Sequence, residues 1–143
     1  MTIEEQLRAA YINKTLSTTM PPLSFKRRMD LVRRVIEALS PEVLRTPLLA
    51  MRCNERQQTY PLRDGLTVGS GQDCDVVLQS PYVSSFHCLF ERMRDNWLVV
   101  DMGSTNGVYV NGERFGKRIL KDGDVIGLGS LMLVFLEGEA EQS

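Results

Sequence analysis

The spacing of hydrophobic positions along the chain changes near Pro47, from helical to extended. Ahead of that point, Thr2 followed by Glu5 matches a capping box, which predicts a short N-terminal helix. Its apolar side carries Ile3, Leu7, Ala10 and Tyr11. Ser24 can cap a second helix that extends to Leu39. Hydrophobic residues recur there at helical spacing, namely Phe25, Met29, Val32, Val35, Ile36 and Leu39.

This second helix has two alternative roles. We expect its apolar stripe to pack against the rest of the protein, through Phe25, Met29, Val32 and Ile36. Its basic side, which includes Lys26, Arg27, Arg33 and Arg34, then faces water. The alternative is an interaction helix for a partner protein or an acidic surface. The linker between the two helices contains candidate kinase sites at Thr15, Thr18 and Thr19, and no pattern singles out one of them.

After Pro47 the pattern is that of β-strands. Short apolar runs alternate with clusters of Gly, Asn, Asp and Pro; the runs lie at 48–51, 66–68, 76–78, 97–100, 108–110 and 131–135. Many short strands without intervening helices predict an all-β sandwich or barrel. Asn111-Gly112 is a tight-turn dipeptide, and Asp122 and Asp124 are expected to be solvated residues of another turn.

Composition and charge narrow the classes of function. The 143 residues are 43% hydrophobic and 24% charged, with a formal net charge of -1, which favours neither nucleic acid nor an anionic membrane surface. No apolar run resembles a signal peptide or a membrane span. The odd number of cysteines, without CxxC spacing, predicts reduced thiols in a cytoplasmic protein, with neither a disulfide framework nor a zinc site. No cofactor or other metal is expected.

Four motifs occur in order along the β region. They are VG at 68–69, VSSFH at 83–87, DMGSTNG at 101–107 and VNG at 110–112, and LKDGDVIGLG follows at 120–129. In a chain predicted to be β, this order resembles the forkhead-associated (FHA) domain. The resemblance implies a two-sheet FHA-like β-sandwich, which we place over residues 48–138. The hydrophobic pattern predicts a helical extension and linker before it, over residues 1–47, and the polar end predicts a flexible tail after it, over residues 139–143.

The resemblance also implies a phosphopeptide site on the loops at one end of the sandwich. At the matching positions of the family, the Ser84 hydroxyl contacts the phosphate of a phosphothreonine and Thr105 borders it, while Asn106 holds the peptide backbone. Ser70 and Ser85 complete the candidate set. Gly69, His87 and Gly107 are expected to be structural, with His87 organising the loops through hydrogen bonds.

Two positions depart from the family pattern. Ser70 follows Gly69 where the family has an arginine, and Ser85 stands where a basic residue or an asparagine is common. We therefore expect an adaptor that binds another protein through a degenerate or phosphate-independent surface. The alternative is a phosphothreonine reader in which Arg52, Arg56 or Lys117 replaces the missing arginine. Catalysis is not expected, because adjacent residues such as His87 and Cys88 point to opposite faces of a strand.

Overall fold

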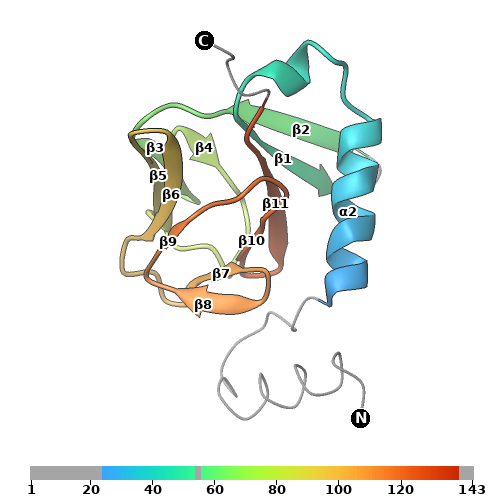
Figure 1. The fold of residues 1–143 in the computed structure, drawn as a ribbon. Helices are drawn as coiled ribbons and strands as arrows, with labels where there is room; N and C mark the ends of the chain where they lie inside the picture. Colours follow the sequence, from blue (N-terminus) through green and yellow to red (C-terminus); the bar gives the residue numbers. More distant parts are fainter. Residues whose placement is uncertain (1–23, 54–55, 139–143) are drawn as a thin grey trace.

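Two β-sheets pack face to face in the computed structural model, which describes residues 24–53 and 56–138 (Figure 1). Within those residues, the first sheet has the strand order β2-β1-β11-β10-β7-β8 and the second has the order β4-β3-β5-β6-β9. The first sheet consists of β1 (Leu48–Cys53), β2 (Arg56–Pro61), β7 (Val108–Val110), β8 (Glu113–Phe115), β10 (Val125–Leu128) and β11 (Leu131–Leu136). The second consists of β3 (Leu66–Gly69), β4 (Val76–Val77), β5 (Cys88–Met93), β6 (Asn96–Asp101) and β9 (Lys117–Ile119). The predicted all-β sandwich with an N-terminal helical extension is confirmed.

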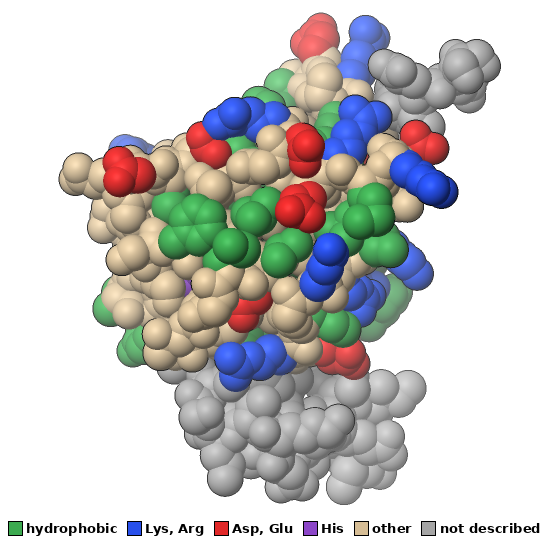
Figure 2. Space-filling model, turned by 90° about the vertical axis from the view of Figure 1, so that its left-hand side faces the viewer, with side chains coloured by type: hydrophobic (Ala, Val, Ile, Leu, Met, Phe, Trp, Pro, Cys, Tyr) green, Lys and Arg blue, Asp and Glu red, His purple; other side chains and the backbone are tan. Residues whose placement is uncertain are grey.

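The core between the sheets is built from alternate residues of the strands. In β6, Trp97 and Val99 point into the core. Leu98 and Val100 therefore lie on the outer face of the second sheet, since side chains alternate along a strand. Figure 2 shows the molecule from the side of this sheet, where hydrophobic side chains form a band between acidic and basic ones.

The central part of the first sheet, around β1 and β11, is covered on both faces. Leu133 and Phe135 of β11 point into the core between the sheets, whereas Val134 and Leu136 belong to a second cluster on the outer face. The helix α2 (Phe25–Glu37) packs over that outer face, beside β1 and β11 (Figure 1). Burial on both faces explains why β11 reads as an unbroken hydrophobic run.

The helix begins as the sequence predicts. The Ser24 side chain accepts a hydrogen bond from the Arg27 backbone N–H at 3.2 Å, which satisfies one of the free donors of the first turn. After Glu37 the chain makes a 3-10 turn, η1 (Val43–Arg45), before it enters β1.

The face of α2 that packs on the sheet differs from the predicted one. Val32 and Val35 are buried, with exposed fractions of 6% and 0%. Phe25, Met29 and Ile36 are exposed by 69%, 45% and 39%, so the expectation that they dock is wrong. The apolar stripe of α2 is wider than its contact with the sheet, and only one flank of the stripe is covered.

The Asn111-Gly112 turn has the conformation that the sequence predicts, whereas the turn that contains Asp124 differs from its prediction. Asn111 and Gly112 have φ values of 53° and 89°, as a tight turn between β7 and β8 requires. Asp124, expected to be solvated, is instead buried, and its carboxylate accepts hydrogen bonds from the Asn111 side chain and the Lys121 backbone N–H. The Asn111 side chain also accepts a bond from the Val125 backbone N–H, so it joins two turns of the first sheet.

Several expectations lie outside the described residues: the first helix, the linker threonines Thr15, Thr18 and Thr19, and the C-terminal tail. Over residues 24–53 and 56–138, no helix has the length and apolar character needed to cross a bilayer.

The two neighbouring residues Val35 and Ile36 offer a matched test of which side of α2 packs on the sheet. Val35→Ala removes two buried methyl groups from the outer cluster and is expected to lower the free energy of unfolding by about 2 kcal/mol. Ile36→Ala, on the exposed flank, is expected to change it by less than about 0.5 kcal/mol. Urea denaturation of both variants measures the difference. Equal losses would contradict this orientation of the helix.

Candidate functional site

Three loops of the sandwich meet at one end of the molecule. They are the loop after β3, the loop between β4 and β5, and the loop between β6 and β7. The first and second loops are joined by backbone hydrogen bonds, from Ser70 N–H to the Ser84 carbonyl at 2.9 Å and from Gly71 N–H to the Ser85 carbonyl at 3.0 Å. The sequence-predicted candidates Ser70, Ser84 and Ser85 are therefore neighbours in space.

Ser84 also joins the second loop to the third. Its Oγ accepts a hydrogen bond from the Thr105 backbone N–H at 3.1 Å. The Asn106 side chain makes a parallel link, because its Nδ2 donates to the Tyr82 carbonyl at 2.9 Å. All five candidate residues thus lie on one connected set of loops, and two of their side chains already brace it.

The first loop approaches the second so closely that it needs glycine. A Cβ on Gly69 would lie 2.3 Å from the Ser85 carbonyl oxygen, and one on Gly71 would lie 2.8 Å from the same atom. Both distances are below any real Cβ contact. The Cys74 thiol also donates to this carbonyl, at 3.2 Å. The Ser85 side chain itself is exposed beside this contact.

His87 lies beneath the loops and is completely buried. Its Nδ1 accepts a hydrogen bond from the Ser84 backbone N–H at 3.1 Å. Because a backbone N–H can only donate, Nδ1 carries the lone pair and the proton is on Nε2, which donates to the Gly107 carbonyl at 2.8 Å. The neutral imidazole therefore connects the second and third loops from below.

The third loop is shaped by its own local hydrogen bonds. The Asp101 carboxylate accepts from the Ser104 N–H at 3.0 Å, and the Ser104 hydroxyl accepts from the Gly107 N–H at 2.9 Å. Gly107 has a φ of +86°, a conformation that residues with a side chain rarely adopt. These constraints hold Thr105 and Asn106 at the tip of the loop.

A basic residue that the sequence reasoning missed lies beside this tip. A Cβ on Gly107 would be 2.5 Å from Nε of Arg114, so the guanidinium group crosses the backbone next to Asn106. Arg114 is on β8 opposite Tyr109, two residues beyond Gly107 along the chain. Arg114 lies beside Gly107 because of the register of the β7–β8 hairpin, which the Asn111-Gly112 turn fixes. The sequence could indicate this proximity only through that register.

The three cations proposed from the sequence lie in different places. Arg52 lines a surface pocket with Arg34, Glu37 and Ala38, beside the helix. Arg56 pairs with Cys53 across the β1–β2 hairpin. Lys117 is on the edge strand β9 opposite Val100, one residue before Asp101, where the third loop begins.

His87 and the adjacent Cys88 are both held inside the fold. Both nitrogens of His87 are bonded to backbone groups. Cys88 is buried, and desolvation by burial strongly raises the pKa of its thiol. In the part of the chain that the structure describes, no group of three or more His, Cys, Asp or Glu side chains could hold a metal ion.

Comparison with known proteins decides the family. A model of the FHA domain matches residues 66–129. The crystal structure of the FhaA FHA domain complexed with the intracellular domain of Rv3910 is 33% identical with a TM-score of 0.59, and the match covers 63% of this chain and 99% of that one. The chain belongs to the FHA family. A further FHA structure, the MEK1 domain in complex with a HOP1 phosphothreonine peptide, is 35% identical with a TM-score of 0.53 and covers 64% of this chain and 97% of that one.

Among relatives of known sequence, the oxoglutarate dehydrogenase inhibitor of Corynebacterium jeikeium is 43% identical over 82 residues. The match covers 56% of this chain and 57% of the inhibitor, so the chain spans little more than half the length of this relative.

The role of His87 in the FHA loops can be tested by stability. His87→Ala would leave the Ser84 N–H and the Gly107 carbonyl without their partner, and is expected to lower the free energy of unfolding by about 3 kcal/mol. The exposed Ser85 provides the control, since Ser85→Ala is expected to change stability by less than about 0.5 kcal/mol. Thermal and urea unfolding measure both. A loss in His87→Ala no larger than in the control would contradict the bracing role.

The loop between β3 and β4 gives a pH-dependent prediction. The Asp75 carboxylate accepts bonds from the Thr67 N–H at 2.9 Å and the Thr67 hydroxyl at 3.0 Å, and pairs with Arg63; these bonds hold its pKa below the ordinary value of 3.8. A lowered pKa means that Asp75 stabilises the fold above pH 3.8 and that this contribution is lost as the pH falls through the folded-state pKa. Asp75→Asn is therefore expected to lose less stability than the wild type on acidification through that window. If the free energy of unfolding of the two proteins falls equally on acidification, as measured by urea denaturation, the bonds of Asp75 do not stabilise the fold.

Proposed function

We propose that the chain is a non-enzymatic adaptor whose FHA loops bind a partner protein with weak dependence on phosphate. The observation that carries the proposal is the connected loop set around Ser84, combined with uncharged side chains at positions 70 and 85. Phosphate recognition needs donors that converge from several loops, and usually an arginine. The donors are present here, and the arginine of the family is replaced by Ser70.

The missing charge determines the expected affinity. A hydrogen bond to a charged group contributes about 1.5–3 kcal/mol, so its loss weakens binding about 10- to 150-fold. Phosphothreonine carries about -1.5 to -2 charges near neutral pH, and water competes well for such a group unless a cation compensates its desolvation. Generic phosphothreonine peptides are therefore expected to bind with a dissociation constant of about 100 μM or weaker.

Arg114 supports a second candidate function, that of a phosphothreonine reader with a substitute cation. Its guanidinium lies over Gly107, directly after Asn106, and no ion pair involving it occurs among the described residues. A bound phosphopeptide that crosses the tip of the third loop would pass close to this charge. Lys117 is a further cation near the start of the same loop.

The nature of the partner can be approached through the relative from Corynebacterium jeikeium, which is named an oxoglutarate dehydrogenase inhibitor. An enzyme subunit, bound and regulated without any catalysis by the adaptor, is the class of partner that this name suggests for the shared domain. Cys74 and Cys88 are free thiols, which fits a cytoplasmic location for the adaptor and its partner.

Substitution of Ser70 separates the two functions. The backbone of Ser70 is held beside Ser84, so an arginine introduced there would start from the correct loop position. Ser70→Arg is expected to strengthen binding of a degenerate phosphothreonine library by about tenfold or more, because it supplies the missing charge. Ser70→Gln, which has reach and donors without charge, is the matched control and is expected to bind like the wild type. Isothermal titration calorimetry measures all three proteins.

The outcomes of this titration are distinct. Low-micromolar binding by the wild type, abolished in Arg114→Ala, would show that the second candidate is correct. If Ser70→Arg binds the phosphothreonine library no more tightly than the wild type, the loops do not hold their donors in a geometry that fits phosphate. The proposal that these loops form a phosphate site would then be wrong.

A further inference from the structure

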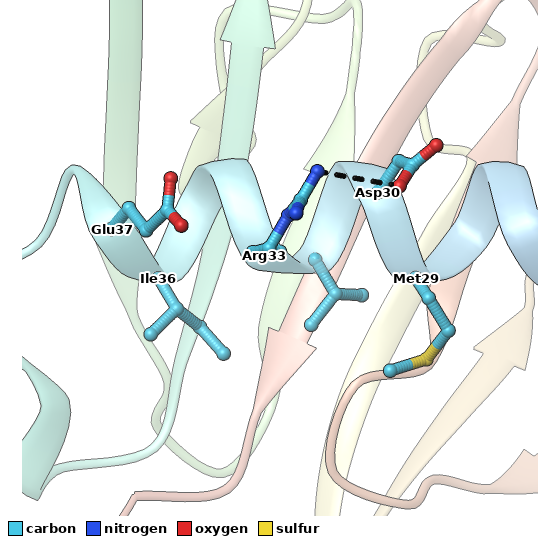
Figure 3. A pocket seen from close by; sticks show the side chains of 6 residues that line it. Met29, Asp30, Arg33, Ile36 and Glu37 are labelled. Atoms are coloured by element: carbon cyan, nitrogen blue, oxygen red, sulfur yellow. Dashed lines mark hydrogen bonds and ion pairs between the residues drawn. The ribbon is translucent and has the colours of Figure 1, made fainter.

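One side of α2 carries apolar residues that the sandwich does not cover. Phe25, Met29 and Ile36 lie within about 40° of one another around the helix, because successive residues are about 100° apart. They border the buried Val32 and remain exposed themselves. Figure 3 shows Met29 and Ile36 projecting together from the helix. We call the three exposed residues the α2 stripe.

A charged edge runs along the helix beside the α2 stripe. Its four residues lie within about 60° of one another around the helix and are Lys26, Asp30, Arg33 and Glu37. Figure 3 shows Asp30, Arg33 and Glu37 on the side that adjoins the stripe. Stripe and edge share a groove of about 420 Å³, whose lining residues all belong to α2: Met29, Asp30, Val32, Arg33, Ile36 and Glu37.

The charged edge is neutral as a whole, but its charges alternate along the helix. Two cations and two carboxylates give it a net charge of zero, so it favours neither an acidic nor a basic partner. From the N-terminal end, the signs are plus, minus, plus and minus, in the order Lys26, Asp30, Arg33 and Glu37. Lys26 and Glu37 are equally far from the midpoint of the edge, and so are Asp30 and Arg33. Reversing the direction of the helix therefore puts an opposite charge at each of the four levels.

This charge pattern fits a second copy of the same helix that runs antiparallel. A two-fold axis at the midpoint of the edge brings Lys26 of each copy opposite Glu37 of the other, and Asp30 opposite Arg33. Asp30 and Arg33 already pair within one copy, at 3.5 Å, so four charges meet at the centre of the contact. A parallel pair would instead place each charge against its own kind, which is repulsive. The antiparallel axis also brings the two α2 stripes together and removes both from water.

We infer that the α2 stripe and its charged edge form the interface of an antiparallel homodimer of this chain. The inference goes beyond the proposed function of the FHA loops and does not depend on it. None of the loop residues lines the groove, so a dimer presents two sets of FHA loops, and a partner with two binding segments gains affinity through avidity. A single pair of helices buries less than the roughly 1,200 Å² at which stable interfaces begin, so we expect a weak dimer with a dissociation constant of about 50 μM.

Charge reversal at the two ends of the edge tests this pairing. Lys26→Glu sets carboxylates against carboxylates in the homodimer, and Glu37→Lys sets ammonium groups against each other. Each variant is therefore expected to weaken dimerisation by about tenfold or more. Sedimentation equilibrium of the full chain, over about 5 to 500 μM, measures the dissociation constants. Both changes suit the helix dipole, which favours an acid in the first turn and a base in the last, so neither is expected to unfold α2.

An equimolar mixture of the two variants tests the antiparallel geometry directly. In a mixed pair, each altered side chain faces an opposite charge on the other chain, so a heterodimer of about wild-type affinity is expected. The double variant Lys26→Glu/Glu37→Lys is expected to form a homodimer again for the same reason. Arg27→Glu changes the net charge as much as Lys26→Glu, but on another side of α2, and is expected to leave dimerisation unchanged. Met29→Ser/Ile36→Ser removes most of the stripe and is expected to weaken the dimer by about tenfold or more.

Several results would overturn the inference. A wild-type chain that stays monomeric at about 500 μM would assign the α2 stripe to another occupant. A dimer that Lys26→Glu and Arg27→Glu weaken equally would depend on net charge alone. If the mixture of the two charge variants does not dimerise, the helices are not paired antiparallel. If Met29→Ser/Ile36→Ser dimerises like the wild type, the interface lies elsewhere on the molecule.

Discussion

The loop end of this sandwich depends on a buried imidazole whose two nitrogens bond to two different loops. His87 accepts from Ser84 and donates to Gly107, and both bonds use backbone atoms. Buried backbone groups without partners destabilise a fold, so these two loops cannot separate without a cost. The positions of Ser84, Thr105 and Asn106 follow from this arrangement, whether or not a phosphate is bound.

The two departures from the family pattern, at Ser70 and Ser85, have limited structural consequences. Ser70 and Ser85 participate in the loop contacts through their backbone atoms, so the identity of either side chain does not affect those bonds. The geometry of the family can therefore persist while its charge is lost. An interface with neutral donors favours recognition through shape and peptide-backbone contacts, which suits an adaptor for a folded partner.

The helical extension serves a different purpose from the loops. Val32 and Val35 complete a hydrophobic cluster on the outer face of the first sheet, which allows β1 and β11 to be apolar on both sides. Phe25, Met29 and Ile36 of α2 remain exposed beside this packing. The molecule thus presents two chemically different surfaces, a polar one on the loops and an apolar one along the exposed side of the helix.

The sequence by itself determined the fold class, the Ser24 cap and the Asn111-Gly112 turn, because each depends on residue types close together in the chain. It also indicated the strands that are rich in apolar residues, such as those containing Trp97 and Phe135. Strands β2, β8 and β9 are polar and lie at the edges of the sheets, and the sequence does not predict them, because half-exposed strands lack a clear hydrophobic pattern.

The tertiary structure decided which part of a helical stripe is buried and which distant side chains become neighbours. The spacing of Phe25, Met29, Val32 and Ile36 indicates a common side of the helix, but the rotation of α2 on the sheet depends on packing against β1 and β11. The burial of Asp124 depends on Asn111 across a second turn. Arg114 reaches Gly107 only because a hairpin folds back between them. Such relations are long-range, and no local pattern of residues encodes them.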